Sequence, residues 1–149
     1  MKYEFTGETR VEFGITLKRI RALVDLKAWG VIKGDLGGWV EKEENLVQVF
    51  DNAWVSGNAR VSGNAWVSGN AWVSGNAQTT KTPIQIGGVD WPITISDAHM
   101  QIGCEVHLLT EWQSFDNEAI ARMDGYKARH FWDKYKELLL GLARASGRV

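Results

Sequence analysis

A six-residue repeat dominates the middle of the chain and limits the folds that the chain can adopt. Between residues 49 and 78 a valine recurs every six residues, and an alanine follows each valine four positions later. An α-helix repeats about every 3.6 residues and a flat strand every two, so a period of six fits neither element alone. It fits a short strand followed by a turn, repeated at a constant angle. The valines are Val49, Val55, Val61, Val67 and Val73, and the alanines are Ala53, Ala59, Ala65, Ala71 and Ala77.

The residue types in the repeat suit such a coiled ribbon. Valine is stiff about χ1 and favours a buried, pleated wall, and alanine is small enough for a crowded interior. The Gly-Asn pairs that follow (57–58, 63–64, 69–70 and 75–76) tolerate the positive φ of a corner. We therefore expect the valines and alanines to face inward.

The repeat Val-Ser-Gly-Asn-Ala-x resembles the hexapeptide repeat of left-handed parallel β-helices. The flanking segments GDLGGWVEKEENL (34–46) and IGCEVHLLTEW (102–112) are similar to a group of phage and prophage proteins that carry variable numbers of such repeats. Most of those proteins have no assigned function. The resemblance therefore implies a fold and a viral origin, and it implies no reaction.

The regions on either side of the repeat differ from it in pattern. Residues 1–48 are predicted to form a strand-rich N-terminal cap, with one or two strands between residues 11 and 26. In this cap, Gly37-Gly38 is interpreted as a turn, because no Lys-Ser/Thr follows and no helix begins there as in a phosphate-binding loop. Residues 49–78 are predicted to form the β-helix.

Residues 79–149 are predicted to form a C-terminal domain of strands and helices. WPITIS (91–96) and HMQIGCEVHLL (99–109) are expected to be two strands that form a hairpin. The segment from Thr110 to Gln113 has the spacing of a capping box, which indicates a helix start. A longer helix is predicted from about Tyr126 to Ala145, and the whole chain is predicted to be α+β. The apolar face of this longer helix comprises Ala128, Phe131, Trp132, Tyr135, Leu138, Leu139 and Leu142.

The last position of each hexad holds a large side chain that is expected to point outward. Three hexads make one coil in the resembled fold, so residues eighteen apart are expected to stack: Trp54 under Trp72, Arg60 under Gln78, and Trp66 above Gln48. Outward tryptophans mark either an interface between subunits or domains, or a ligand site with Arg60 reaching a phosphate. The candidate ligand- or partner-binding residues are Trp54, Arg60, Trp66, Trp72 and Gln78.

Catalytic and metal-binding patterns are weak. The three histidines, His99, His107 and His130, lie outside the repeat, and their spacing matches no metal motif, so no metal site and no cofactor are expected. Glu105 and His107 are expected to share one side of a strand. Cys104 is expected to face the other side, as a small buried apolar residue.

Composition sets limits on partners and location. The formal net charge is −1, which gives no overall footprint for nucleic acid, although residues 127–144 carry a mildly basic helix face. The polar start and the lack of long apolar runs predict no signal peptide and no membrane span. The single cysteine excludes an intrachain disulfide, and these features together predict a cytoplasmic protein. The resemblance to phage proteins implies that the cell is an infected or lysogenic bacterial host.

Three functions remain open at this stage. The first is a non-enzymatic phage protein that acts on the host, as an inhibitor of anti-phage immunity that sequesters a nucleotide-derived signal or blocks a protein partner. The second is a structural or assembly module, which the near-identity of the repeats favours. The third is a hexapeptide-repeat enzyme using Glu105 and His107. A homo-oligomer is expected in each case, with a trimer favoured, because packing between copies would bury the tryptophans.

Overall fold

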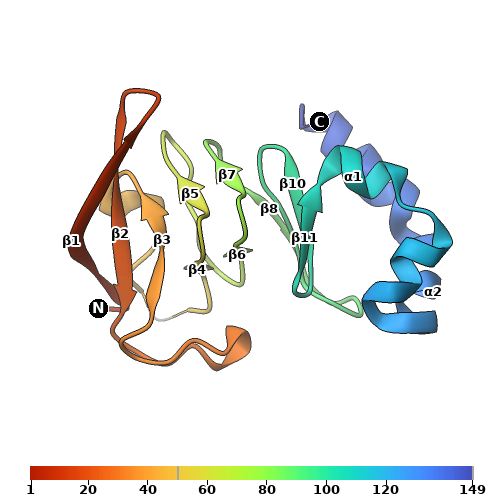
Figure 1. The fold of residues 1–149 in the computed structure, drawn as a ribbon, viewed down its shortest axis with the longest axis horizontal. Helices are drawn as coiled ribbons and strands as arrows, with labels where there is room; N and C mark the ends of the chain where they lie inside the picture. Colours follow the sequence, from red (N-terminus) through yellow and green to blue (C-terminus); the bar gives the residue numbers. More distant parts are fainter. Residues whose placement is uncertain (50, 149) are drawn as a thin grey trace.

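The N-terminal region is an antiparallel hairpin with a third strand beside it (Figure 1). The structure is a computed structural model that describes residues 1–49 and 51–148. The sheet comprises β1 (Tyr3–Glu12), β2 (Ile15–Ala22) and β3 (Leu36–Val40), with 3-10 helices η1 (Lys27–Trp29) and η2 (Glu43–Asn45) after β2 and β3. These strands confirm the strand-rich character predicted for the first 48 residues.

The repeat forms very short strands that pair in parallel. The strands are β4 (Trp54–Val55), β5 (Arg60–Val61), β6 (Trp72–Val73) and β7 (Gln78–Thr79). β4 pairs with β6 and β5 pairs with β7, so that each residue lies beside the residue eighteen positions further along. The predicted partners Trp54 with Trp72 and Arg60 with Gln78 are confirmed.

The side chains predicted to face inward are buried, with one exception. Val55, Val61, Val67 and Val73 are at most 1% exposed, and the five repeat alanines are at most 3% exposed. Val49 is 67% exposed, so its predicted inward position is wrong.

The exception has a physical reason in the register at the start of the repeat. β3 continues the parallel stack, but Trp39 pairs with Arg60 and Leu46 bridges to Val67, each twenty-one residues apart. Three additional residues therefore separate Leu46 from Val55, and the buried Leu46 takes the inward place predicted for Val49. The same shift places Asn45, not Gln48, beside Trp66.

Gly37 and Gly38 lie inside β3, so the interpretation of this pair as a turn is wrong. A Cβ added at Gly37 would lie 2.8 Å from Cζ2 of Trp54, and one added at Gly38 would lie 2.7 Å from the carbonyl oxygen of Ala59. These glycines let β3 approach the repeat closely enough to bury the Trp54 indole.

The C-terminal sheet is antiparallel and has four strands where two were predicted. It comprises β8 (Ile84–Ile86), β9 (Ile93–Ile95), β10 (His99–Ile102) and β11 (Glu105–Leu108), in the spatial order β11-β10-β9-β8. The predicted second strand is divided at Gly103, whose φ of 59° forms the turn between β10 and β11.

Two helices cover this sheet (Figure 1). α1 (Leu109–Ser114) begins close to the predicted helix start, but the cap is formed by Glu111, which accepts from the backbone N–H of Leu108 at 2.9 Å. α2 (Asn117–Ala145) includes the predicted helix and begins earlier. Its backbone is not helical at Asp124 and Gly125.

The apolar face predicted for α2 is correct in part. Ala128, Phe131, Trp132 and Leu139 are buried, but Leu138 is 65% exposed and Leu142 is 37% exposed. Leu140 and Ala143 are buried in their place, because the C-terminal half of the helix turns a different stripe toward the sheet.

The buried residues form two clusters. One joins the N-terminal sheet to the interior of the repeat, and the other lies between the C-terminal sheet and the helices. The chain is therefore an α+β protein with several small sheets and a long C-terminal helix. Within residues 1–49 and 51–148, no helix has the length and apolar character needed to cross a membrane.

Candidate recognition surface

The tryptophans at equivalent positions of the repeat have different environments. Trp54 is 0% exposed, and its indole packs against β2 and β3 near Ile20 and Gly37. Trp72 is half-buried and stacks on Trp29, with ring centroids 4.9 Å apart. Trp54 is therefore covered by the N-terminal strands of its own chain, not by the C-terminal region or another protomer as the interface interpretation expected.

Arg60 is held by the N-terminal hairpin. Its Nη1 donates to Oε1 of Glu12 at 2.8 Å, and its Nη2 donates to the carbonyl oxygen of Asn76 at 3.0 Å. Hydrogen bonding to Arg60 lowers the pKa of the Glu12 carboxyl below its ordinary value. An arginine stands here in place of tryptophan because the hairpin brings a carboxylate over this side of the repeat. Gln78, its partner in β7, is exposed.

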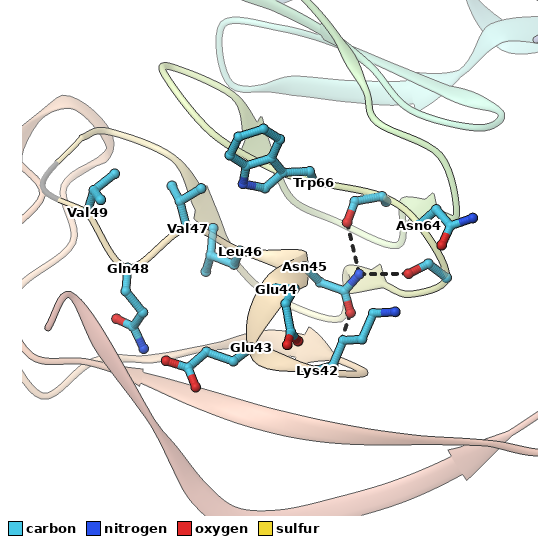
Figure 2. Close-up of a pocket in the computed structure, with 12 residues that line it drawn as sticks. Lys42, Glu43, Glu44, Asn45, Leu46, Val47, Gln48, Val49, Asn64 and Trp66 are labelled. Atoms are coloured by element: carbon cyan, nitrogen blue, oxygen red, sulfur yellow. Dashed lines mark hydrogen bonds between the residues drawn. The ribbon is translucent and has the colours of Figure 1, made fainter.

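Trp66 is the repeat tryptophan that remains open to solvent, with 56% of its surface exposed. It lines a groove of about 650 Å³ together with residues 42–49 and 63–65. Figure 2 shows Val47 and Val49 on the same side of their segment as the Trp66 indole, with Gln48 directed the opposite way. Gln48 is held there by the backbone of Tyr3, since its Oε1 accepts from that N–H at 3.1 Å.

A buried asparagine fixes the floor of the groove. The Nδ2 group of Asn45 donates to the carbonyl oxygens of Ala65 at 2.9 Å and Gly63 at 3.2 Å, and its Oδ1 accepts from Lys42 N–H at 2.9 Å (Figure 2). Asn45 is 0% exposed, so these bonds satisfy an amide that would otherwise be costly to bury. The groove is therefore pre-formed rather than a gap between loose segments.

The rim of the groove is acidic. Glu43 and Glu44 are exposed, and neither forms an ion pair with a residue that the structure describes. Lys42 is the one cation among the described residues that line the groove. The surface thus combines an exposed indole and two valines with a small excess of negative charge.

The structure divides the sequence-predicted site residues among different sides of the repeat. Trp54 and Trp72 lie on one side, Arg60 and Gln78 on a second, and Trp66 on a third. The groove segment 42–49 was missed as part of a site. Its only signal in the sequence was the local acidity of Glu41, Glu43 and Glu44.

The other candidate residues lie in the C-terminal sheet. Glu105 and His107 do share one side of β11, with His107 Nε2 2.9 Å from Oε1 of Glu105. His107 also packs edge-on against Trp112 and Phe115. Cys104 is exposed in the turn before β11, so its predicted burial is wrong. Gly103 and Cys104 form the tight turn between β10 and β11.

Histidines and carboxylates do not gather into a metal site in the part of the chain that the structure describes. Burial lowers the pKa of His99, which favours its neutral form. Comparison of the chain with protein-family models, with curated proteins and with solved structures finds no match in any of the three.

Proposed function

We propose that the chain is a phage-encoded binding protein, without catalytic activity, that acts on its bacterial host by engaging a host protein through the groove beside Trp66. The observation that carries the proposal is the 56% exposure of Trp66 on a groove whose floor is fixed by the buried Asn45. Exposed tryptophans at pre-formed concavities are typical anchors of protein recognition. The viral origin rests on the resemblance of the repeat and its flanking segments to phage proteins.

We further propose that the repeat is a short left-handed parallel β-helix with three hexads per coil. The parallel pairing of residues eighteen apart supports this geometry, as does the burial of four repeat valines. In this fold the side of the coil that carries Trp66 is the one that neither the N-terminal strands nor Trp29 covers.

The groove favours a protein partner over a nucleotide-derived signal. A phosphate would meet Glu43 and Glu44 on the rim, and the carboxylates would repel it. Arg60, the residue expected to reach a phosphate, is paired with Glu12 on another side of the repeat. The partner we propose therefore presents an apolar side chain to Trp66, Val47 and Val49, flanked by Lys or Arg for the rim.

A component of bacterial anti-phage immunity is the proposed target. The test is the plaquing efficiency of a restricted phage on bacteria that carry one immune system and express this chain. Wild type is expected to restore plaquing about 100-fold or more, and Trp66→Ala is expected to abolish the effect, because a central aromatic anchor contributes about 2–4 kcal/mol to binding. Leu138→Ala, an exposed apolar residue far from the groove, is the matched control.

Self-assembly through the same surface is the second function to be separated, because packing between copies would also bury Trp66. Light scattering of wild type and Trp66→Ala decides between the two. An oligomer that Trp66→Ala converts to monomers, with plaquing unchanged, contradicts the host-partner proposal and favours an assembly module. If mass spectrometry detects a nucleotide released on denaturation, the result would instead favour the hypothesis that the chain sequesters a nucleotide-derived signal.

A further inference from the structure

A second concavity lies in the C-terminal region, outside the repeat. It has a volume of about 310 Å³ and is enclosed by the β10–β11 turn, by the part of α2 before its break and by the part after it. Most of its lining is apolar or aromatic, and the aromatic residues are Trp91, Trp112, Phe131 and Trp132. A cavity of this size and character is typical of a small-molecule site.

The break in α2 shapes this cavity. Gly125 has φ 63° and ψ −146°, a conformation that side-chain-bearing residues rarely adopt. The break leaves Ile120 and Met123 on one wall and Ala128 on another, and it brings Asp124 to the mouth. An unbroken helix would present these residues as one continuous stripe. The break therefore separates the two α2 walls of the cavity.

The charged residues that line the cavity are acidic, and one cation, Lys127, lies beside it at the Trp91 ring. Glu105 and Asp124 are the charged residues among the described lining, and both are acidic. Oε1 of Glu105 is engaged by His107 at 2.9 Å. Asp124 is exposed and forms no ion pair with any described residue.

The tryptophan faces already attract a cation within the chain itself. Nζ of Lys127 lies 5.1 Å from the ring centroid of Trp91, in the range of a cation–π interaction. Nε1 of Trp112 donates to the carbonyl oxygen of Met100 at 2.7 Å, which fixes the orientation of that ring. Tilted packing of Trp112 on Trp132, with centroids 5.1 Å apart, continues the aromatic wall.

We propose that this cavity binds a small organic cation with an alkylated ammonium head group. Such a group has a low charge density, so it loses little hydration when aromatic rings surround it, and the ring faces and carboxylates attract its positive charge. A bare ammonium or a metal ion would lose strong hydration in an apolar cavity, and an anion would be repelled by Glu105 and Asp124. This site is independent of the groove beside Trp66.

The test uses the full chain, with choline and its uncharged analogue of matched shape, 3,3-dimethylbutan-1-ol, as probes. Binding is followed by NMR through the indole N–H signals, assigned by Trp→Phe replacements. Choline is expected to bind with a dissociation constant of about 0.1–1 mM and to shift the signals of Trp91, Trp112 and Trp132 while leaving that of Trp66 in place. The alcohol is expected to bind at least about 10-fold more weakly.

Two substitutions at the mouth of the cavity are expected to change the affinity for choline in opposite directions. Asp124→Asn is expected to weaken choline binding about 3- to 5-fold, and Lys127→Gln is expected to strengthen it about 2- to 3-fold by removing a competing cation. Asp133→Asn, an exposed carboxylate on the same helix but outside the lining, is expected to change nothing. The spectrum of the indole N–H signals, recorded without ligand, shows whether each variant is folded.

Three results would overturn the proposal: no shift with choline up to about 20 mM, equal binding of the alcohol, or choline shifts centred on other tryptophans. If Asp124→Asn fails to fold, the sign of the change in Lys127→Gln decides the outcome.

Discussion

Trp54 and Trp66 occupy the same position of the same six-residue motif, yet one is fully buried and the other is 56% exposed. Their neighbours in the motif are alike, so the difference does not come from the sequence of the repeat. It comes from the non-repeat elements, because β2 and β3 cover the side that carries Trp54 and leave open the side that carries Trp66.

This comparison separates two roles within one repeat. The valines and alanines build an interior that is the same in every hexad, whereas the sixth residue adapts to what lies above it. An indole is used where a wall or groove is apolar, and Arg60 is used where Glu12 approaches. The outer residues of a regular repeat therefore report the position of its covering elements.

The difference in burial between Trp54 and Trp66 is tested most directly by replacing each with alanine. Trp54→Ala is expected to lower the free energy of unfolding by about 3–5 kcal/mol, because it leaves a cavity between β2, β3 and the repeat. Trp66→Ala is expected to change it by less than about 0.5 kcal/mol, because the indole is mainly exposed. Urea unfolding followed by circular dichroism measures both, and equal losses would contradict the assignment of one indole to the core.

The attachment of the covering strands can be tested at Lys2. This side chain is buried, with Nζ 2.8 Å from Oδ1 of Asp51 and 2.7 Å from the carbonyl oxygen of Ala53. Asp51→Asn is expected to cost about 2–3 kcal/mol of unfolding free energy, because it leaves a buried ammonium without its counter-charge.

Hydrogen exchange is the second measurement on Asp51→Asn. It is expected to show faster exchange in β1 while the helices of the C-terminal region keep their protection. The surface pair of Glu8 and Arg19 provides the control, and Glu8→Gln is expected to be nearly neutral. Uniform exchange throughout the chain would contradict a local attachment.

The ion pair between Glu12 and Arg60, on the second side of the repeat, can be tested by changing the pH. The pKa of Glu12 is lowered from its ordinary value of 4.5 in the folded chain, chiefly by Arg60. Its carboxylate therefore stabilises the fold above pH 4.5, and this contribution is lost as the pH falls through the lower folded pKa. Glu12→Gln is expected to lose about 0.5–1 kcal/mol at neutral pH, after allowance for solvent screening.

The difference between Glu12→Gln and wild type is expected to shrink in acid. Thermal unfolding at a series of pH values measures it. A difference that stays constant from neutral to acid pH would show that charge is not the cause.

The smallest expected effect is at the tip of the covering hairpin. Phe13 has φ 51° and is 90% exposed, in the two-residue turn that joins Glu12 to Ile15. Asparagine adopts this left-handed conformation at lower cost than phenylalanine. Phe13→Asn is expected to raise the free energy of unfolding by about 0.5 kcal/mol. A decrease in a urea titration would indicate that the phenyl ring contacts the fold.

The interior of the repeat could be predicted from the sequence because each hexad carries the same information. The burial of Val55 to Val73 and the eighteen-residue pairing both follow from that periodicity. The three additional residues before Val55 interrupt the period without a recognisable signal, so Val49 was misplaced.

The covering of Trp54 and the groove beside Trp66 could not be predicted in the same way. Both depend on contacts between segments far apart in the chain, such as Gly37 with Trp54 and Asn45 with Ala65. Such contacts have no period, and a buried glycine in a strand looks like a turn when it is considered alone. The helix start predicted at Tyr126 lies directly after the break in α2, whereas the helical segment that begins at Asn117, before the break, was not predicted.

The eighteen-residue pairing makes the repeat a spacer with a fixed phase. If the repeat is the β-helix proposed above, inserting three hexads would move the C-terminal sheet away from the hairpin by one strand spacing, about 4.8 Å, and leave both facing as before. In that proposed β-helix, inserting a single hexad would carry the sheet on to a neighbouring side of the coil and would place its aromatic cavity at a new angle to the groove. Within the repeat, the proposed β-helix would therefore keep the hairpin and the C-terminal sheet in the same relative orientation only when it is lengthened in steps of eighteen residues, whereas a step of six would change which surfaces face the same direction.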